Sequence, residues 1–567
     1  MFHLKRGLLR NTKNILNVYV KRLNSSTSTS SSTLKTSIPS NGSGLGKQSI
    51  LFVSGILAGG SLVYYQLKNN PSETTFPNSS TTKLKDCDEL KYGDAKEAIF
   101  ELKKQLGESK VTNTKFEIEH HSDSSWATDH ARPDEYPLAI VYPESTEEVS
   151  KALKICHDLK VPVVPFTGGT SLEGHFISTR TGICIDLSKM NKIIELHKED
   201  LDIVVQPAVG WESLRDYLND YNLLFGPDPG PGACIGGMVA TSCSGTNAAR
   251  YGTMRENVVS VTVVLPDGTI VKTKRRPRKS SAGYNLTNLF IGSEGTLGIV
   301  TEVTLKLNIK PKFENVALIP FNNLAGAAKS VADIIQEGIQ LNAIELLDDK
   351  MMHFVNHSNQ TEVKYEELPT LLLKIGGTSP EATGTLTKSV QDIVKKNGST
   401  GFKFASSEEE KFELWNARKV ALWSTIQYGK DTIDKDIQVW STDVAVPISK
   451  FVESLEATKE EIEKSGLVSS IVGHAGDGNY HAIILFKESE RKIASQLVEN
   501  MVQRALKLDG TVSGEHGIGV GKKEFLIDEV GQDAVDLMRK IKFAIDPHKI
   551  LNPDKVFAID PVNDRTI

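Results

Sequence analysis

Two histidines near the C-terminus are spaced so that they could bind one metal ion. His474 and His481 flank a Gly-Asp-Gly-Asn run, and apolar, often β-branched residues stand on both sides of it. This pattern predicts a hairpin in which His474 closes one strand and His481 opens the next. Glu515 and His516 follow in TVSGEHGIG, beside glycines that permit close packing. His474, His481 and Glu515 would make a three-ligand metal site with open positions. The residues alone equally allow a turn Asp between two packed histidines.

Three glycine-rich segments earlier in the chain predict one extended cofactor. The first, TGGTSLEGH (167–175), directly follows the predicted strand VPVVPF. Bare backbone N–H groups at a strand end suit a pyrophosphate. The second segment (227–252) is small and nearly uncharged, so its backbone can pack flat against a large ring, and the third lies within 289–307. A tight loop without a ligand would explain any one of them, but not three that are separated by predicted strands.

These segments resemble the FAD domain shared by vanillyl-alcohol oxidase and its relatives, in the branch of D-2-hydroxyacid dehydrogenases and glycolate oxidase subunits. The resemblance rests on PFTGGTSLEGH, PGPGACIGGMVATSCSGTNAARYG and FIGSEGTLGIVTEV, and with the C-terminal motifs it covers residues 133–557. It implies an α+β fold with a vanillyl-alcohol-oxidase-type FAD-binding domain and an α+β substrate domain. It implies non-covalent FAD, because Thr170 stands where covalently flavinylated relatives often carry His. The implied FAD contacts are Thr167, Gly168, Gly169, Thr170, Ser171, Gly174, Gly232, Gly236, Gly237, Ser242, Gly245, Gly252, Glu294, Gly295, Ile299 and Asn552.

The resemblance also implies a divalent metal, zinc or manganese, at His474, His481 and Glu515. A 2-hydroxy acid would bind such a metal through its hydroxyl and one carboxylate oxygen, which lowers the hydroxyl pKa. His516, next to a ligand, would take the hydroxyl proton as general base, and the C2 hydride would pass to the flavin. Family position favours Arg418 over Lys419 as the cation for the substrate carboxylate; the alternative is a surface Arg.

The size of the substrate follows from two departures from the pattern of relatives that act on 2-hydroxyglutarate. Ser441 stands where those relatives have Lys, and Ile483 stands where they have a polar residue. Neither residue offers a partner to a second carboxylate, so D-lactate is the expected substrate. D-2-hydroxyglutarate and glycolate are the alternatives within the same fold. A zinc hydrolase and a membrane-tethered binding module without chemistry are remote ones.

The N-terminal residues predict targeting and membrane attachment. Residues 1–72 contain nine Lys or Arg and no acid, and Ser and Thr are frequent. This composition is typical of a mitochondrial presequence, expected over 1–46, although a disordered tail would share it. Residues 48–67 are uncharged and long enough to span a bilayer, so 47–68 is the expected transmembrane anchor, with a buried core helix as the alternative. The catalytic body would then face the intermembrane space from the inner mitochondrial membrane.

The rest of the chain is acidic. It holds 57 basic against 71 acidic residues, a balance of −14. This argues against nucleic acid as a partner and suits a basic protein partner. The resemblance implies cytochrome c as the electron acceptor, with a quinone in the membrane as the alternative. The expected divisions after the anchor are a linker over 69–95, the FAD-binding domain over 96–312, the metal-binding substrate domain over 313–535 and a segment over 536–567 that returns to the FAD domain.

The local pattern also predicts individual elements. Ser145 with Glu148 predicts a capping box at the start of a helix, and residues 258–271 predict a strand, an Asp-Gly turn and a return strand. Further predicted strands are LAIVYP, NAIELLDD and TLLLKIGG, and further predicted helices are 449–464 and 490–507.

Overall fold

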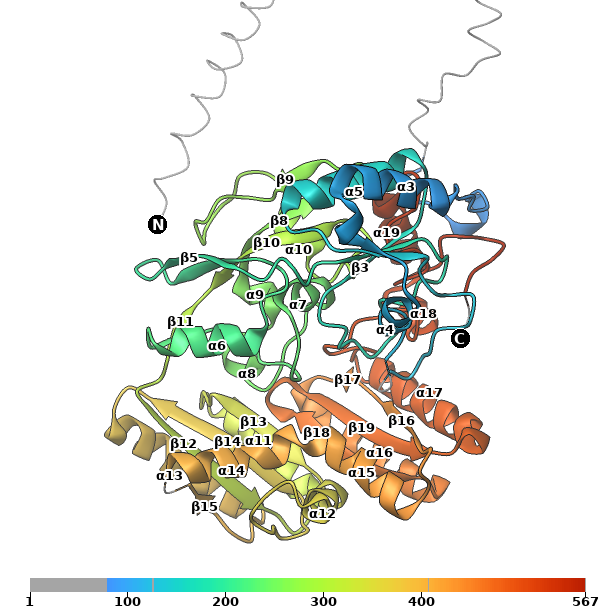
Figure 1. The fold of residues 1–567 in the computed structure, drawn as a ribbon. Helices are drawn as coiled ribbons and strands as arrows, with labels where there is room; N and C mark the ends of the chain where they lie inside the picture. The colour runs from blue at the N-terminus through green and yellow to red at the C-terminus, as the bar shows by residue number, and fades with distance from the viewer. Residues whose placement is uncertain (1–78, 125–126, 406, 566–567) are drawn as a thin grey trace, which may run out of the picture. The chain divides into compact units, whose positions relative to one another are not determined.

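The computed structural model describes residues 79–124, 127–405 and 407–565, which belong to one compact unit. The predicted presequence (1–46) and membrane anchor (47–68) lie outside the described residues. Within the described ranges, no helix is both long and apolar enough to cross a membrane. The unit has two lobes: strands β1 to β11 build the first, and strands β12 to β19 build the second (Figure 1).

The first lobe begins with a four-stranded sheet in the order β1-β2-β4-β3. Strands β2, β4 and β3 are parallel, whereas β1 runs antiparallel to β2. The predicted strands LAIVYP and VPVVPF form β2 and β3, and helix α5 connects them. Ser145 caps α5, but Glu148 accepts a hydrogen bond from Glu144 N instead of completing the predicted capping box. The elements are η1 (Leu84–Asp86), α3 (Ala95–Leu106), η2 (Glu108–Lys110), β1 (Val111–Thr112), α4 (Lys115–His120), β2 (Ala139–Val141), α5 (Thr146–Asp158), β3 (Val163–Phe166) and β4 (Ile183–Asp186).

A second, antiparallel sheet in the order β5-β6-β10-β8-β9 completes this lobe. The predicted strand, Asp-Gly turn and return strand at 258–271 are confirmed as β8 and β9. The second glycine-rich segment forms short helices before β8. The elements are β5 (Ile193–His197), β6 (Asp202–Val205), α6 (Trp211–Asn219), β7 (Leu223–Leu224), α7 (Ile235–Thr241), α8 (Ala248–Tyr251), α9 (Met254–Asn257), β8 (Val258–Val264), β9 (Ile270–Lys272), α10 (Leu286–Phe290), β10 (Ile299–Lys306) and β11 (Asn308–Ile309), which pairs with β7.

The second lobe is an eight-stranded antiparallel sheet with helices on both faces (Figure 1). Its order is β15-β12-β14-β13-β18-β19-β16, and β17 pairs with β19 beside this path. The predicted strands NAIELLDD and TLLLKIGG form β13 and β14, and the helices predicted over 449–464 and 490–507 form α16 and α17. The elements are β12 (Phe313–Pro320), α11 (Leu324–Gln336), β13 (Ala343–Leu347), α12 (Asp349–Ser358), β14 (Thr370–Gly377), α13 (Pro380–Lys396), β15 (Lys403–Phe404), α14 (Glu408–Lys419), α15 (Ala421–Thr432), β16 (Gln438–Ser441), β17 (Val444–Ala445), η3 (Ile448–Lys450), α16 (Phe451–Ser465), β18 (Val468–His474), η4 (Ala475–Asp477), β19 (Asn479–Phe486), η5 (Glu488–Glu490) and α17 (Arg491–Lys507).

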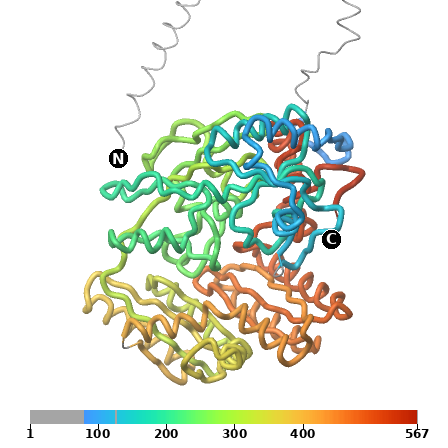
Figure 2. The backbone as a smooth tube through the Cα atoms, viewed as in Figure 1, coloured from blue at the N-terminus to red at the C-terminus, as the bar shows by residue number. Residues whose placement is uncertain are grey.

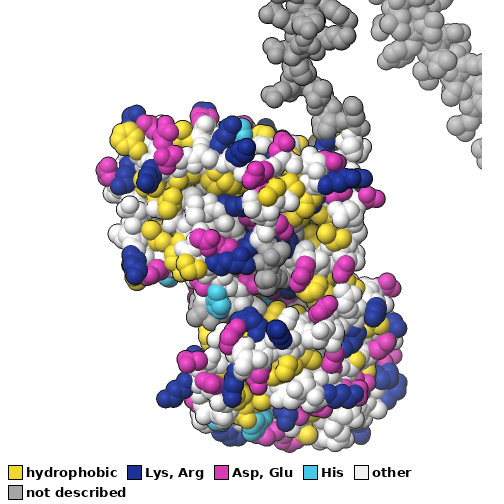
Figure 3. Space-filling view, turned by 90° about the vertical axis from the view of Figure 1, so that its right-hand side faces the viewer, with side chains coloured by type: hydrophobic (Ala, Val, Ile, Leu, Met, Phe, Trp, Pro, Cys, Tyr) yellow, Lys and Arg dark blue, Asp and Glu magenta, His cyan; other side chains and the backbone are white. Residues whose placement is uncertain are grey.

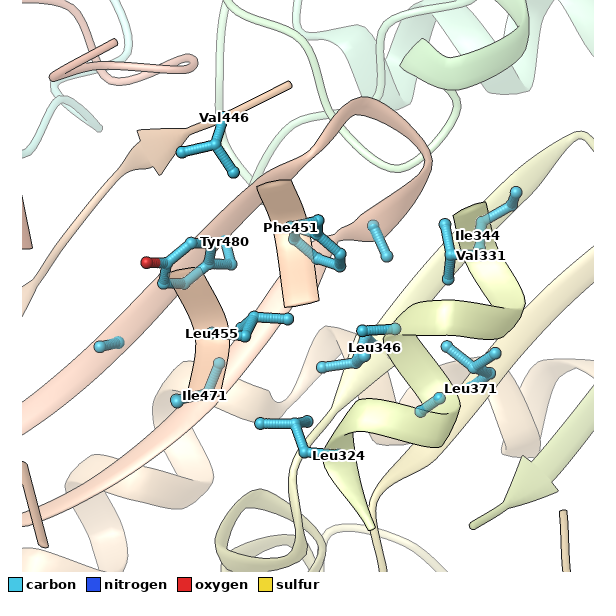
Figure 4. Packing of buried hydrophobic residues seen from close by; sticks show 14 of the residues in the cluster. Leu324, Val331, Ile344, Leu346, Leu371, Val446, Phe451, Leu455, Ile471 and Tyr480 are labelled. Atoms are coloured by element: carbon cyan, nitrogen blue, oxygen red, sulfur yellow. The ribbon is translucent and has the colours of Figure 1, made fainter. Parts of the chain in front are cut away.

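Alternation along these strands divides the core of the second lobe between the two faces of the sheet. On one face, Leu346 and Ile471 belong to a buried cluster that includes Leu455 of α16 (Figure 4). On the other face, Leu347 and Val472 pack with helices α12, α14 and α15. This second face is the one that carries the candidate site.

The C-terminal segment returns to the first lobe. Helices α18 (Lys523–Val530) and α19 (Gln532–Ile545) are found in the red part of the chain beside the blue part (Figures 1 and 2). Asn552 N donates a hydrogen bond to Val163 O of β3 at 2.7 Å. The buried Lys542 ammonium donates to Thr296 O and Leu551 O, at 2.6 Å each. These bonds place Asn552 beside the third glycine-rich segment.

Candidate metal and flavin site

The predicted histidine hairpin is present. Strands β18 and β19 pair antiparallel with Val472 opposite His481, and η4 makes the turn. His474 ends β18, and His481 lies two residues inside β19. Residues directly opposite each other share a face of the sheet, as do alternate residues of one strand. His474 and His481 therefore share the second face with Glu345 of β13, which lies opposite His474.

Hydrogen bonds determine which nitrogen of each ring faces inward. His481 Nδ1 lies 2.9 Å from Thr442 O, and His474 Nδ1 lies 2.9 Å from Glu345 Oε1. These oxygens only accept, so Nδ1 carries the hydrogen and Nε2 offers a lone pair. The two Nε2 atoms lie 3.0 Å (His474) and 3.4 Å (His481) from Glu515 Oε1. When both rings are neutral, two lone pairs and a carboxylate oxygen face one point, and a cation at that point would satisfy all three.

Electrostatics agree with this geometry. Burial opposes a charge on His474, but the carboxylates of Glu345 and Glu515 outweigh it and raise its pKa well above the ordinary value. Burial likewise opposes ionisation of Glu515, yet His474 and His481 hold its pKa well below its usual range. The cluster therefore favours added positive charge at the point between these side chains.

Asp443 organises the loop that carries Glu515 and His516. Its Oδ2 accepts hydrogen bonds from His516 N (2.7 Å), Ser513 Oγ (2.8 Å) and Glu515 N (2.9 Å). Its Oδ1 accepts a hydrogen bond from the Asn479 side chain at 2.9 Å. Asp443, His481 and His516 are close enough to form a second set of possible ligands. Because both oxygens of Asp443 are already engaged, we assign it to holding the loop.

Two carboxylates of the first lobe hold the other side of this loop. Glu294, in the third glycine-rich segment, accepts hydrogen bonds from Ile518 N and Gly519 N at 2.7 Å each. Glu173, in the first segment, places Oε1 3.3 Å from His516 Nδ1. A Cβ on Gly519 would lie 2.0 Å from Glu173 O, so only glycine permits this approach. The glycine-rich segments thus position the loop that bears the candidate base.

Arg418 projects from α14 toward the same cluster. It lies one helical turn after the buried Leu414, on the face that packs against the sheet. Its Nε donates to Glu345 Oε2 at 2.5 Å. The neighbouring Lys419 is exposed, and its ammonium lies 5.5 Å from the centroid of the Phe412 ring. Arg418, and not Lys419, therefore contacts the histidine–carboxylate cluster.

A cavity of about 690 Å³ joins this cluster to the three glycine-rich segments. Its size is within the range of ordinary ligand sites. It brings together most residues predicted from the sequence. Those that line it are Thr167, Gly168, Gly169, Thr170, Ser171, Gly232, Gly236, Gly237, Gly245, Glu294, Gly295, Ile299, Arg418, His474, His481, Glu515, His516 and Asn552.

Three residues predicted to contact the cofactor do not line this cavity: Gly174, Ser242 and Gly252. All three have positive φ angles, of 69°, 56° and 77°. Ser242 directly follows α7 and Gly252 directly follows α8, each as the C-cap residue. The three residues therefore lie at turns of the backbone, next to segments that line the cavity.

Buried polar atoms at the glycine-rich end fit a polar cofactor. Within the described residues, Asn552 Oδ1 and both ring nitrogens of His175 have no hydrogen-bond partner. His175 Nε2 lies 3.1 Å from Glu294 Oε2, but without hydrogen-bond geometry. Leaving such atoms unpaired is costly, so a ligand that bonds to them is favoured. A Cβ on Gly168 would lie 2.7 Å from Gly232 O, which shows how closely two of the segments approach.

Sequence reasoning missed Glu173, Glu345, Asp443 and Ser244, whose Oγ donates to Glu515 Oε2 at 2.6 Å. Two of them carried a usable signal. Glu173 is the only charged residue before the histidine of TGGTSLEGH, and Glu345 interrupts the apolar run of a predicted strand. Acidic residues in such places need partners. Ser244 carried none, because serine is common in loops.

Comparison with known proteins shows the family to which the chain belongs. Residues 137–274 match the family described as FAD binding domain, and 310–556 match the family described as FAD linked oxidases, C-terminal domain. The chain is 54% identical to the mitochondrial D-lactate dehydrogenase [cytochrome] of Kluyveromyces lactis, over 90% of each chain. It is 52% identical to D-lactate dehydrogenase [cytochrome] 1 of Saccharomyces cerevisiae, over 86% of this chain and 84% of that one. The solved structure of p-cresol methylhydroxylase is similar in fold, with a TM-score of 0.65, 19% identity, and coverage of 83% and 98%.

The first lobe is thus an FAD-binding domain of the vanillyl-alcohol-oxidase type, and the α+β fold expected from the sequence is confirmed for the described residues. The cofactor of this lobe is FAD. The high identity over nearly the whole chain establishes the relationship. The chain belongs to the family of FAD-linked oxidases that includes the mitochondrial D-lactate dehydrogenases [cytochrome].

Proposed function

We propose that the protein oxidises D-lactate to pyruvate, with FAD as the immediate electron acceptor and a divalent metal, zinc or manganese, at His474, His481 and Glu515. The observation that carries this proposal is the single cavity lined by both the glycine-rich segments and the histidine–carboxylate cluster. The high identity to D-lactate dehydrogenases supports the substrate. FAD, bound non-covalently beside Thr170, supplies the hydride acceptor, and the metal supplies Lewis-acid polarisation of the hydroxyl.

The side chains of this protein bind the acid and take its proton. Arg418 is held by Glu345 through Nε, and its Nη2 lies 3.5 Å from His474 Nε2. The guanidinium N–H groups not used in these contacts would pair with the substrate carboxylate. His516 receives the hydroxyl proton as general base at Nε2, which makes no hydrogen bond to any described residue. Its ring stacks on His481, with centroids 5.1 Å apart and planes 7° apart, which fixes its place beside the metal ligand.

The cavity wall supports a small substrate. Ser441 of β16 and Ile483 of β19 lie opposite each other in register, and both line the cavity. They offer a hydroxyl and an apolar surface where a longer acid would place its second carboxylate. Burying that carboxylate without a partner is costly. Lys419 also lines the cavity, and its ammonium lies 5.5 Å from the centroid of the Phe412 ring.

Cytochrome c is the proposed final acceptor, and the inner mitochondrial membrane the proposed location with the body in the intermembrane space. The names of the relatives support a cytochrome acceptor and a mitochondrial location, and the acidic balance of residues 73–567 suits a basic acceptor. The uncharged segment 48–67 supports attachment to a membrane. On the face in Figure 3, acidic and basic side chains are interspersed, so the acceptor would meet a mixed surface there. The domain divisions at 96–312, 313–535 and 536–567 remain part of this proposal.

A substrate panel tests the function. Purified protein containing FAD is mixed anaerobically with D-lactate, L-lactate, glycolate or D-2-hydroxyglutarate, and bleaching of the visible flavin band is followed. We expect D-lactate to reduce the flavin fastest. If glycolate or D-2-hydroxyglutarate reduces the flavin faster, that acid and not D-lactate is the substrate. A protein whose flavin none of these acids reduces would refute it.

A further inference from the structure

The candidate base His516 has an acidic partner that comes from the opposite lobe. Glu173 is 3% exposed, and its Oε1 lies 3.3 Å from His516 Nδ1. The same oxygen lies 3.0 Å from Lys522 Nζ. The Lys522 ammonium pairs with this carboxylate and opposes the rise in pKa that burial would cause. The carboxylate is therefore ionised, and an ionised carboxylate can only accept a hydrogen bond.

This contact decides where the hydrogen sits on the neutral imidazole of His516. A ring whose Nδ1 faces a carboxylate carries its hydrogen on Nδ1 and leaves the lone pair on Nε2. Nε2 is the nitrogen that a base at the cavity needs. If the hydrogen moved to Nε2, the ring would present a donor to the substrate hydroxyl and could not take its proton.

Two features show that Glu173 does more than form a salt bridge with Lys522. Its backbone carbonyl accepts hydrogen bonds from Val520 N at 2.8 Å and Gly521 N at 3.3 Å, so the loop of the base is docked onto this residue. Lys522 also lies 3.6 Å from Asp443 Oδ2, which binds His516 N. The ammonium thus pairs with two carboxylates, and Glu173 remains ionised beside the ring.

We propose that Glu173 is a positioning residue that fixes the tautomer and orientation of His516 and stabilises the imidazolium formed during substrate oxidation. This inference rests on the proposed function. In the step it assists, the O–H bond of the hydroxy acid breaks and the proton goes to Nε2, while the C2 hydride leaves to FAD. The hydrogen on Nδ1 stays in place, and Glu173 stays ionised. The logic is that of the acid behind the base in a Ser-His-Asp triad.

The test compares Glu173→Gln with Glu173→Asp in protein containing both FAD and metal. Stopped-flow reduction by D-lactate gives the limiting rate of flavin reduction and the dissociation constant of the substrate. In the Gln variant, we expect the limiting rate to fall about 100-fold, the low end of what general acid–base catalysis contributes. The dissociation constant and the FAD and metal contents should change little. The Asp variant, which keeps the charge, should recover part of the rate.

Isotope effects separate positioning from a damaged fold. With proton transfer impaired, the Gln variant should show a larger solvent deuterium isotope effect on flavin reduction than the unmodified protein does. Glu135→Gln is the matched control, because Glu135 is also buried (4% exposed) and ion-paired, to Arg565, but does not line the cavity. Its reduction rate should be unchanged.

The outcomes distinguish the two proposals. If D-lactate does not reduce the flavin of the unmodified protein, the proposed function fails. If the unmodified protein is reduced and Glu173→Gln is reduced at the same rate, the inference fails alone. Two other outcomes would assign Glu173 a structural role and also overturn the inference. In the first, Glu173→Gln is reduced slowly and has lost FAD. In the second, Glu173→Gln is reduced slowly, its solvent isotope effect is unchanged, and Glu173→Asp recovers none of the rate.

Discussion

Replacing His481 with alanine should remove the metal while FAD stays bound. His481 is buried on β19, a strand of the second lobe, whereas the cofactor segments belong to the first lobe. The substitution deletes one of the three proposed ligand atoms, the Nε2 that lies 3.4 Å from Glu515 Oε1. It leaves the backbone of β18 and β19 intact. Turnover of D-lactate should be lost together with the metal.

The size of the effect follows from ligand number. Loss of a group that only supports a ligand costs about 10–100-fold in metal affinity, so loss of a ligand should cost more. At a metal concentration 100 times the dissociation constant, binding stabilises the unmodified protein by about 2.7 kcal/mol. If the variant binds the metal 100-fold more weakly, binding at the same metal concentration stabilises it by only about 0.4 kcal/mol. In addition, Thr442 O loses its partner, which costs about 1–3 kcal/mol if no water replaces it.

The assay measures metal per protein, FAD per protein and the rise in Tm on adding zinc or manganese. His121→Ala is the control, since His121 is also buried and lies 2.9 Å from Asp186 Oδ2, outside the candidate site. The control should keep its metal, and His481→Ala should lose the metal-dependent rise in Tm. Full metal occupancy and normal turnover in His481→Ala would refute the ligand assignment.

Three further predictions concern substrate and acceptor. The kcat/KM for D-lactate should exceed that for D-2-hydroxyglutarate by about 10–200-fold, because Ser441 and Ile483 leave a second carboxylate unpaired. In steady-state kinetics, Ser441→Lys should reduce this ratio of the two kcat/KM values. Arg418→Met should weaken D-lactate binding by about 10–150-fold, the loss of a charge-assisted bond, whereas an unchanged dissociation constant in stopped-flow titrations would remove Arg418 from the carboxylate site. The rate of cytochrome c reduction should fall as the salt concentration rises to physiological ionic strength, where the Debye length is about 8 Å. The rate of reduction of a neutral dye should not fall. A rate of cytochrome c reduction that does not depend on salt would contradict docking steered by charge.

Local patterns were sufficient to predict the elements that carry the site. Apolar residues on both sides of a Gly-Asp-Gly-Asn turn specify a hairpin, because the side-chain period of a strand and the turn residues agree. Arg418 was chosen over Lys419 by family position, and it lies on α14 one turn after the buried Leu414. The glycine-rich segments were readable because each follows or precedes a strand. These are all short-range features of the chain.

The partners of the site residues could not be predicted in this way. Glu345 meets His474 across 129 residues, because β13 lies beside β18 in the sheet, and strand order is not encoded in any local period. Glu173 meets His516 across 343 residues and two lobes. Gly174, Ser242 and Gly252 were assigned to the cofactor by the resemblance, and their contact with FAD stays a prediction. Their positive φ angles show that a turn also accounts for small residues at these positions.

The most direct test of the account is a single-turnover measurement on one protein sample. FAD-containing protein is stripped of metal with a chelator, mixed anaerobically with D-lactate, and measured again after zinc or manganese is restored. The account predicts that the flavin stays oxidised in the stripped protein and bleaches rapidly once the metal returns, because His474, His481 and Glu515 hold the cation beside the flavin cavity. Equal rates of bleaching with and without metal, at verified metal contents, would contradict it.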